Sequence, residues 1–135
     1  EEAVGKAASA VSRFAAVRRY LVRLQQQVTR ERSLIIDGRD IGTVVLPDAK
    51  IKIYLTASAE ERAMRRYRQL INAGKDADYA QVLADLKARD HQDQNRAVDP
   101  LRPAEDAVIL DSTGMSFEEN LERMVDIVNE AYDQH

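Results

Sequence analysis

Three short apolar runs alternate with longer segments of helical periodicity, and this alternation restricts the fold more than any other feature of the chain. The runs cover residues 33–36, 51–55 and 107–110, and polar or turn-forming residues follow each of them. Segments 59–73 and 116–128, which come after the second and third runs, carry apolar residues at the helical period. Strands that alternate with helices predict an α/β fold with a thin parallel sheet, whose sites lie beyond the carboxyl ends of the strands.

Local signals place the helix boundaries. Apolar residues recur at the helical period over residues 4–28, which predicts an amphipathic helix interrupted near Phe14. Ser58 and Glu61 fit a capping box at the start of the helix that follows the second run. Gly74 comes directly after the last periodic residue of that helix, where a glycine usually ends a helix.

Composition excludes several classes of function. The 135 residues are 44% hydrophobic and 32% charged, which suits one globular domain. A net charge of -3 argues against a general nucleic-acid or anionic-membrane surface, and no apolar stretch is long enough to cross a bilayer. The chain has no cysteine, so disulfides and thiolate metal sites are excluded, and His91 and His135 lack the spaced partners of a metal site. A cytoplasmic location, with no nucleic-acid or membrane partner, is therefore expected.

The densest group of chemically useful residues follows the first apolar run. Residues 37–43 read Asp-Gly-Arg-Asp-Ile-Gly-Thr. Glycine lets the backbone approach a ligand, Arg39 offers a planar fork of donors for phosphate, and Asp37 and Asp40 could orient a base, a water or a hydrated Mg²⁺. An Asp-Gly turn with a surface ion pair explains the same letters, and the sequence pattern leaves both interpretations open.

A second charged group lies on the helix expected to begin near residues 76–78. Arg89, Asp93 and Arg96 are spaced by four and three residues, so two guanidinium groups could flank one carboxylate on a single helix face. Ion pairs on a solvated helix have the same spacing and are common. The extension of this stretch into a loop bounded by Pro100 favours a mobile lid that closes on an anion.

Two further groups of arginines lie on expected helices. A charged outer face explains most of them, although the second group could jointly hold a triphosphate opposite the acidic loop. The first group lies downstream of Ser9 on the opening helix and the second on helix 59–73: Arg13, Arg18, Arg19 and Arg23, then Arg62, Arg65, Arg66 and Arg68.

Several segments together resemble the bacterial cytidylate kinase family. They cover residues 34–45, 47–49, 52–55, 89–101 and 110–113, in the same order and spacing as in that family. The run Asp-Gly-Arg-Asp-x-Gly-Thr-Val-Val is quite specific to it among nucleoside monophosphate kinases. The resemblance implies a P-loop nucleoside monophosphate kinase-like parallel sheet with flanking helices and a helical lid.

The resemblance also implies a reaction, the transfer of the ATP γ-phosphate to CMP or dCMP to give CDP or dCDP. By position, Arg39 and Arg96 would grip the acceptor phosphate, while Arg89 and Asp93 would meet the sugar hydroxyls. Phosphoryl transfer needs positioning and charge neutralisation more than a covalent nucleophile, so this set of residue types is chemically coherent.

Base recognition and the donor side follow from the same resemblance. Ser9, Arg18 and Asp40 would recognise cytosine. Asp37 would hold a water on the Mg²⁺ that bridges the phosphates of ATP, and Arg65 or Arg66 would serve the donor nucleotide.

The chain departs from the family in one respect. A complete enzyme begins with a strand and a Gly-x-x-x-x-Gly-Lys-Ser/Thr loop, and Gly5-Lys6 lacks the preceding glycine and strand. In the family the first strand lies between those corresponding to residues 34–36 and 51–55, so the sheet expected here is incomplete. We therefore expect a portion of a longer protein that is inactive alone, and monomeric once the missing N-terminal segment is present.

The expected parts of this single partial kinase domain are acceptor-side helices (1–31), core strands and helix (32–73), lid region (74–103) and C-terminal core strand and helix (104–135).

Two alternatives remain at this stage. Another small-molecule P-loop kinase, of the UMP/CMP or shikimate type, would share the Asp-Gly strand end and an arginine-bearing lid. A non-catalytic helical interaction module built on residues 4–28 is the other, although it leaves the three apolar runs unexplained.

Overall fold

The computed structural model describes residues 2–30, 33–95 and 97–133. Contacts divide the chain into two compact units, Glu1–Ala49 with Gln94–Arg102, and Lys50–Asp93 with Pro103–His135. The predicted lid region, 74–103, is thereby shared between the two units. No helix in the described ranges combines the length and the apolar character needed to cross a bilayer.

The first unit is built on two helices. α1 (Glu2–Val11) and α2 (Ala15–Thr29) are separated at Phe14, which has an extended backbone with φ −80° and ψ 118°. The Phe14 amide donates to the Val11 carbonyl over 3.1 Å and so closes the end of α1. The interruption predicted near Phe14 is confirmed.

A π-helical turn, η1 (Ile41–Val45), follows the Asp-Gly-Arg-Asp loop in the same unit. The Leu46 amide donates to the Ile41 carbonyl over 2.7 Å. The two residues are five positions apart, which is the separation typical of a π-helical turn. Gln26 of α2 donates through Nε2 to the Val45 carbonyl at 3.0 Å, so α2 supports the turn. A Cβ on Gly38 would lie 2.8 Å from the Ile41 side chain, so only glycine fits the loop there without a shift.

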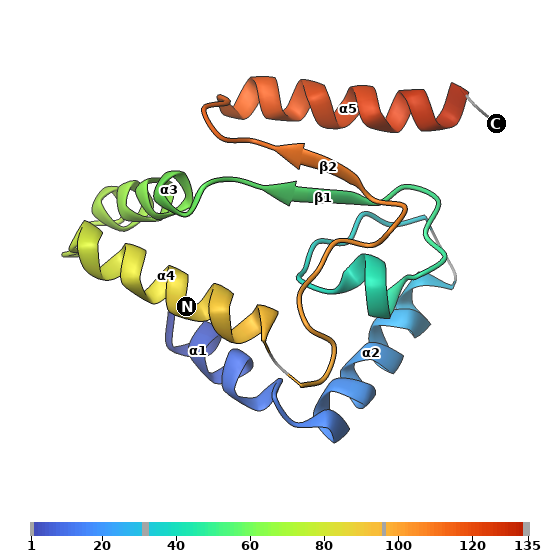
Figure 1. The fold of residues 1–135 in the computed structure, drawn as a ribbon, viewed down its shortest axis with the longest axis horizontal. Coiled ribbons are helices and arrows are strands. Elements are labelled where there is room, and N and C mark those ends of the chain that lie inside the picture. The colour runs from blue at the N-terminus through green and yellow to red at the C-terminus, as the bar shows by residue number, and fades with distance from the viewer. Residues whose placement is uncertain (1, 31–32, 96, 134–135) are drawn as a thin grey trace. The chain divides into compact units, whose positions relative to one another are not determined.

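The second unit contains the sheet. β1 (Ile53–Thr56) and β2 (Val108–Asp111) pair in parallel (Figure 1). Ile53 lies opposite Val108 in this pair. Two of the three predicted strands are thus confirmed. The third, residues 33–36, is wrong, because this segment has no regular structure and Ile35 is fully exposed. A β-strand requires a hydrogen-bonded neighbouring strand. Among the described residues β1 and β2 pair only with each other, so residues 33–36 have no such neighbour.

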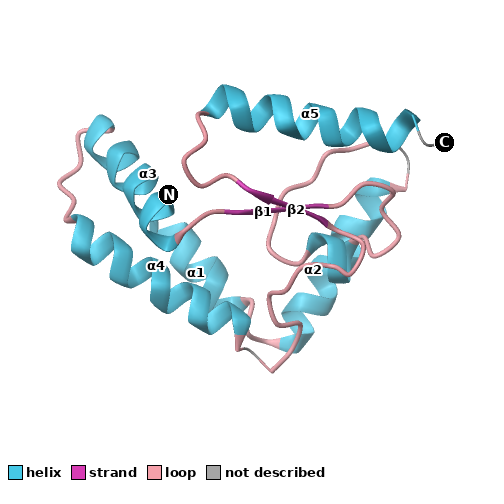
Figure 2. Ribbon diagram, turned by 45° about the horizontal axis from the view of Figure 1, so that its top comes forward, coloured by secondary structure: helices cyan, strands magenta, loops and turns pink. Residues whose placement is uncertain are grey.

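Three helices complete this unit: α3 (Ala59–Asn72), α4 (Tyr79–Gln94) and α5 (Phe117–Asp133). The Glu61 amide donates to Ser58 Oγ over 3.1 Å at the start of α3, and Gly74 beyond its end has φ +70°. The Ser58 cap and the glycine stop are confirmed, but the capping box is incomplete, because the Ser58 amide donates to Thr113 and the Glu61 carboxylate pairs with Arg65. α5 lies beside the strand pair in both ribbon views (Figures 1 and 2). Ile127 of α5 and Leu110 of β2 are buried.

Candidate functional site

A buried arginine between two carboxylates is the main polar feature of the first unit. Arg18, on the inner face of α2, is only 8% exposed. Its Nη2 contacts the Asp40 carboxylate, and its Nε donates to Asp99 Oδ2 over 3.2 Å. Asp40 immediately precedes η1, so the π-turn helps to set the position of its backbone. The structure thus brings together two of the three residues predicted to recognise cytosine.

The sequence reasoning missed Asp99. It lies 81 residues after Arg18 along the chain, so no local spacing could have indicated the pair. Its backbone φ of +50° is the one positive value among the described non-glycine residues. Asp tolerates this left-handed conformation better than most residue types. The residue type at position 99 was therefore the only local signal in the sequence.

Among the other residues predicted for the first unit, Asp37 and Arg39 have described side chains. Asp37 is exposed and Arg39 is half-buried, both in the loop between α2 and η1. Ser9 lies on α1, but its side chain is outside the described residues, as is Arg96 altogether. The structure therefore does not test whether Arg39 and Arg96 converge.

On α4, Asp93 is 5% exposed and lies one helical turn after Arg89. Arg89 Nε is 4.0 Å from Asp93 Oδ2, a loose ion pair of the predicted spacing. A carboxylate near the C-terminal end of a helix faces the negative end of the helix dipole, so its burial requires cationic neighbours. Arg89 supplies one of them while remaining half-exposed.

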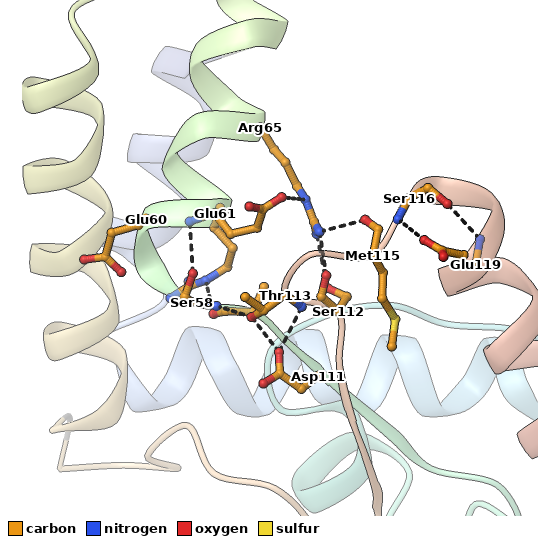
Figure 3. A network of polar contacts seen from close by, with 12 residues as sticks. Ser58, Glu60, Glu61, Arg65, Asp111, Ser112, Thr113, Met115, Ser116 and Glu119 are labelled. Carbon is orange, nitrogen blue, oxygen red and sulfur yellow. Dashed lines mark hydrogen bonds and ion pairs between the residues drawn. The ribbon is translucent and has the colours of Figure 1, made fainter.

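Arg65 of α3 is bound to the turn after β2 rather than directed to solvent. It donates to Ser112 Oγ at 3.1 Å and to the Ser112 carbonyl at 2.7 Å, and contacts Glu61 Oε1 at 3.2 Å (Figure 3). Arg66 is exposed. A role for either in binding the donor nucleotide stays a prediction, and for Arg65 it would require sharing donors that already hold this turn.

The carboxyl ends of the two strands meet in the same network (Figure 3). Thr113 donates through its amide and its hydroxyl to Asp111 Oδ1, over 3.0 and 2.6 Å. The hydroxyl and amide of Thr113 lower the pKa of the Asp111 carboxyl. The Ser58 amide donates to Thr113 Oγ1 over 2.9 Å, which joins the end of β1 to the turn after β2.

The described residues do not form a closed metal site. No group of three His, Cys, Asp or Glu side chains within residues 2–30, 33–95 and 97–133 is placed to hold an ion. Mg²⁺ commonly keeps several waters and is held by one or two carboxylates together with substrate phosphates. The exposed carboxylate of Asp37 is suited to contact a hydrated Mg²⁺ through one of its waters rather than to bind the ion directly.

Comparison with known proteins assigns the family. The family model for cytidylate kinase matches residues 1–130. The chain belongs to the cytidylate kinase family. This confirms the resemblance found in the sequence motifs, and it assigns the P-loop nucleoside monophosphate kinase fold, to which a parallel strand pair with flanking helices conforms.

Similar curated cytidylate kinases cover most of the chain. The one from Pasteurella multocida is 52% identical over 130 residues, which is 96% of this chain and 57% of that protein. The one from Desulfitobacterium hafniense is 50% identical over 94% of this chain and 55% of its own length. The one from Actinobacillus succinogenes is 55% identical over 86% and 52% respectively. The chain thus spans about half the length of the relatives it matches.

Proposed function

We propose that the full-length protein containing this chain transfers the γ-phosphate of ATP to CMP or dCMP, giving ADP and CDP or dCDP, in the cytoplasm. The main support is the pairing of the buried Arg18 with the part-buried Asp40 in a chain of the cytidylate kinase family. Cytosine carries an exocyclic amino donor beside ring acceptors, so a carboxylate and a guanidinium placed side by side match its edge. Uracil lacks that amino group and fits the carboxylate less well.

The family motif supports arginines as the ligands of the acceptor phosphate. Arg39 and Arg96 are proposed to bind it, because guanidinium forks match phosphate oxygens and stay charged at physiological pH. Arg89 and Asp93 are proposed to meet the sugar hydroxyls. The carboxylate of Asp93 suits this task, since it is an acceptor held in place by its burial on α4.

The donor side rests on the family alone. ATP is the proposed donor, with Mg²⁺ to neutralise charge on its phosphates. Asp37 would contact the hydrated ion, and Arg65 or Arg66 the donor nucleotide.

Steady-state assays of the full-length protein with ATP and a panel of CMP, dCMP, UMP, AMP and shikimate test the proposal. Intact mass of the same sample establishes which chain is assayed. We expect the highest kcat/KM with CMP or dCMP. A preference for any other acceptor would refute the proposed substrate and favour a different small-molecule kinase.

A further inference from the structure

We propose that Asp99 is a positioning residue for base recognition: it holds the Arg18 guanidinium in the orientation in which Arg18 and Asp40 can bind cytosine. The inference rests on the proposed function and deepens it, because it adds a residue outside the predicted site. Arg18, Asp40 and Asp99 all belong to the first compact unit.

The two carboxylates hold different nitrogens of one planar group. Asp99 accepts from Nε and Asp40 contacts Nη2. Two anchors on separate nitrogens fix both the position and the plane of a guanidinium. Within the described part of the chain, the contacts of Arg18 use Nε and Nη2, which leaves the two hydrogens of Nη1 to face a ligand acceptor.

Asp99 also determines how Asp40 can pair with Arg18. A single carboxylate beside an arginine tends to pair in a two-pronged manner, with each oxygen on a different nitrogen. Because Asp99 occupies Nε, Asp40 cannot form that pairing with Nε and Nη2 together. Without Asp99, the Asp40 carboxylate is expected to rotate onto both nitrogens and away from the orientation that accepts from a base amino group.

The backbone of Asp99 supports a functional reading of this contact. Its φ of +50° lies in the left-handed region, and the next residue is Pro100, which favours an extended residue before it. Unfavourable backbone conformations that persist tend to be found at functional sites and to be held by their surroundings. The pairing with the buried Arg18 is one contact that holds the Asp99 backbone in this conformation.

Two substitutions distinguish the contribution of the Asp99 carboxylate from that of the Asp99 backbone conformation. Asp99→Asn keeps the shape of the side chain and Asp99→Gly removes it, and both residue types tolerate positive φ. We expect each variant of the full-length protein to show a roughly tenfold higher KM for CMP, as for loss of a hydrogen bond to a charged group. The kcat and the KM for ATP should stay within about twofold of the parent, while the preference for CMP over UMP falls.

Two comparisons tie the effect to Arg18. Glu130→Gln removes an exposed carboxylate that pairs with the exposed Arg123 at 3.7 Å, and it should behave like the parent. In an Arg18→Ala background, Asp99→Asn should add little to the loss in KM, because two residues that act through one contact are not additive.

The outcomes distinguish this inference from the proposed function. A full-length parent that does not phosphorylate CMP overturns both. An active parent, with a folded Asp99→Asn or Asp99→Gly variant whose KM for CMP and base preference are parental, overturns the inference alone. Equal losses of kcat with CMP and UMP would indicate a general structural role and overturn it as well. If circular dichroism shows that the Asn variant does not fold, the Gly variant decides.

Discussion

Arg62 of α3 donates two parallel hydrogen bonds to the Asp90 carboxylate of α4, over 3.1 and 2.6 Å. The hydrogen bond with Asp90 raises the pKa of Arg62. A second, more exposed pair, Glu60 with Lys87 at 2.9 Å, joins the same two helices. The connection between α3 and α4 therefore depends on the fork geometry of an arginine, which a lysine cannot reproduce.

Arg62→Lys keeps the charge and loses the fork, so it should weaken this connection. We expect a loss of about 1 kcal/mol, equivalent to a melting temperature about 2–4 °C lower for a domain of roughly 150–250 residues. Differential scanning calorimetry of the full-length protein measures it. The matched control is Arg68→Lys, an exposed position on the same helix, which should melt with the parent. Equal melting temperatures for both variants would contradict the prediction.

Arg96→Ala should lower kcat/KM for CMP by about 10²–10³, the usual loss when one preorganised donor to a reacting group is removed. Steady-state kinetics on the full-length protein test this. Arg13→Ala serves as the control, because Arg13 is exposed and its side chain donates to the Ala10 carbonyl one turn away. Parental activity in Arg96→Ala would remove Arg96 from the proposed site.

Ser112→Ala should destabilise the second unit. Ser112 is 1% exposed, and its hydroxyl donates to the Thr56 carbonyl over 3.0 Å while accepting from Arg65. Its removal leaves buried polar groups with fewer partners, at a cost of about 1–3 kcal/mol. The midpoint of urea unfolding should fall accordingly, whereas Ser33→Ala, at an exposed serine, should leave it in place. A parental midpoint for Ser112→Ala would be inconsistent with the role of this hydroxyl.

Acid should weaken the turn at the end of β2. The Thr113 hydroxyl, followed by its amide, lowers the pKa of Asp111 from its ordinary value of 3.8. The stabilisation is therefore complete above pH 3.8 and is lost as the pH falls through the lower value in the folded state. Melting temperatures measured between about pH 5 and pH 2 should fall less steeply in Asp111→Asn, and partly so in Thr113→Val. A slope in Asp111→Asn equal to that of the parent would argue against this linkage.

Helix ends could be predicted because their determinants are local. Ser58 caps α3 through an amide three residues away, and Gly74 adopts the positive φ that ends the helix. The i,i+4 pair of Arg89 and Asp93 follows in the same way from helical spacing. Such features need no knowledge of the rest of the chain.

Long-range relationships could not be predicted. Residues 33–36 have strand-forming letters, but a strand also requires a neighbouring strand, which composition does not provide. The two carboxylates on Arg18 come from different loops, and only Asp40 stands in a recognisable motif. Asp99 can be identified as a partner of Arg18 only from the folded structure.

The parallel pairing of β1 with β2 has a consequence for the order of folding. Thr56 and Ser112, joined by a hydrogen bond across the strand ends, are 56 residues apart along the chain. Closing so long a loop is slow compared with forming capped helices, so α3 and α4 should acquire structure before the strands meet. During synthesis, β1 leaves the ribosome well before its partner, and until β2 follows, the edge of β1 is a surface on which a chaperone could act.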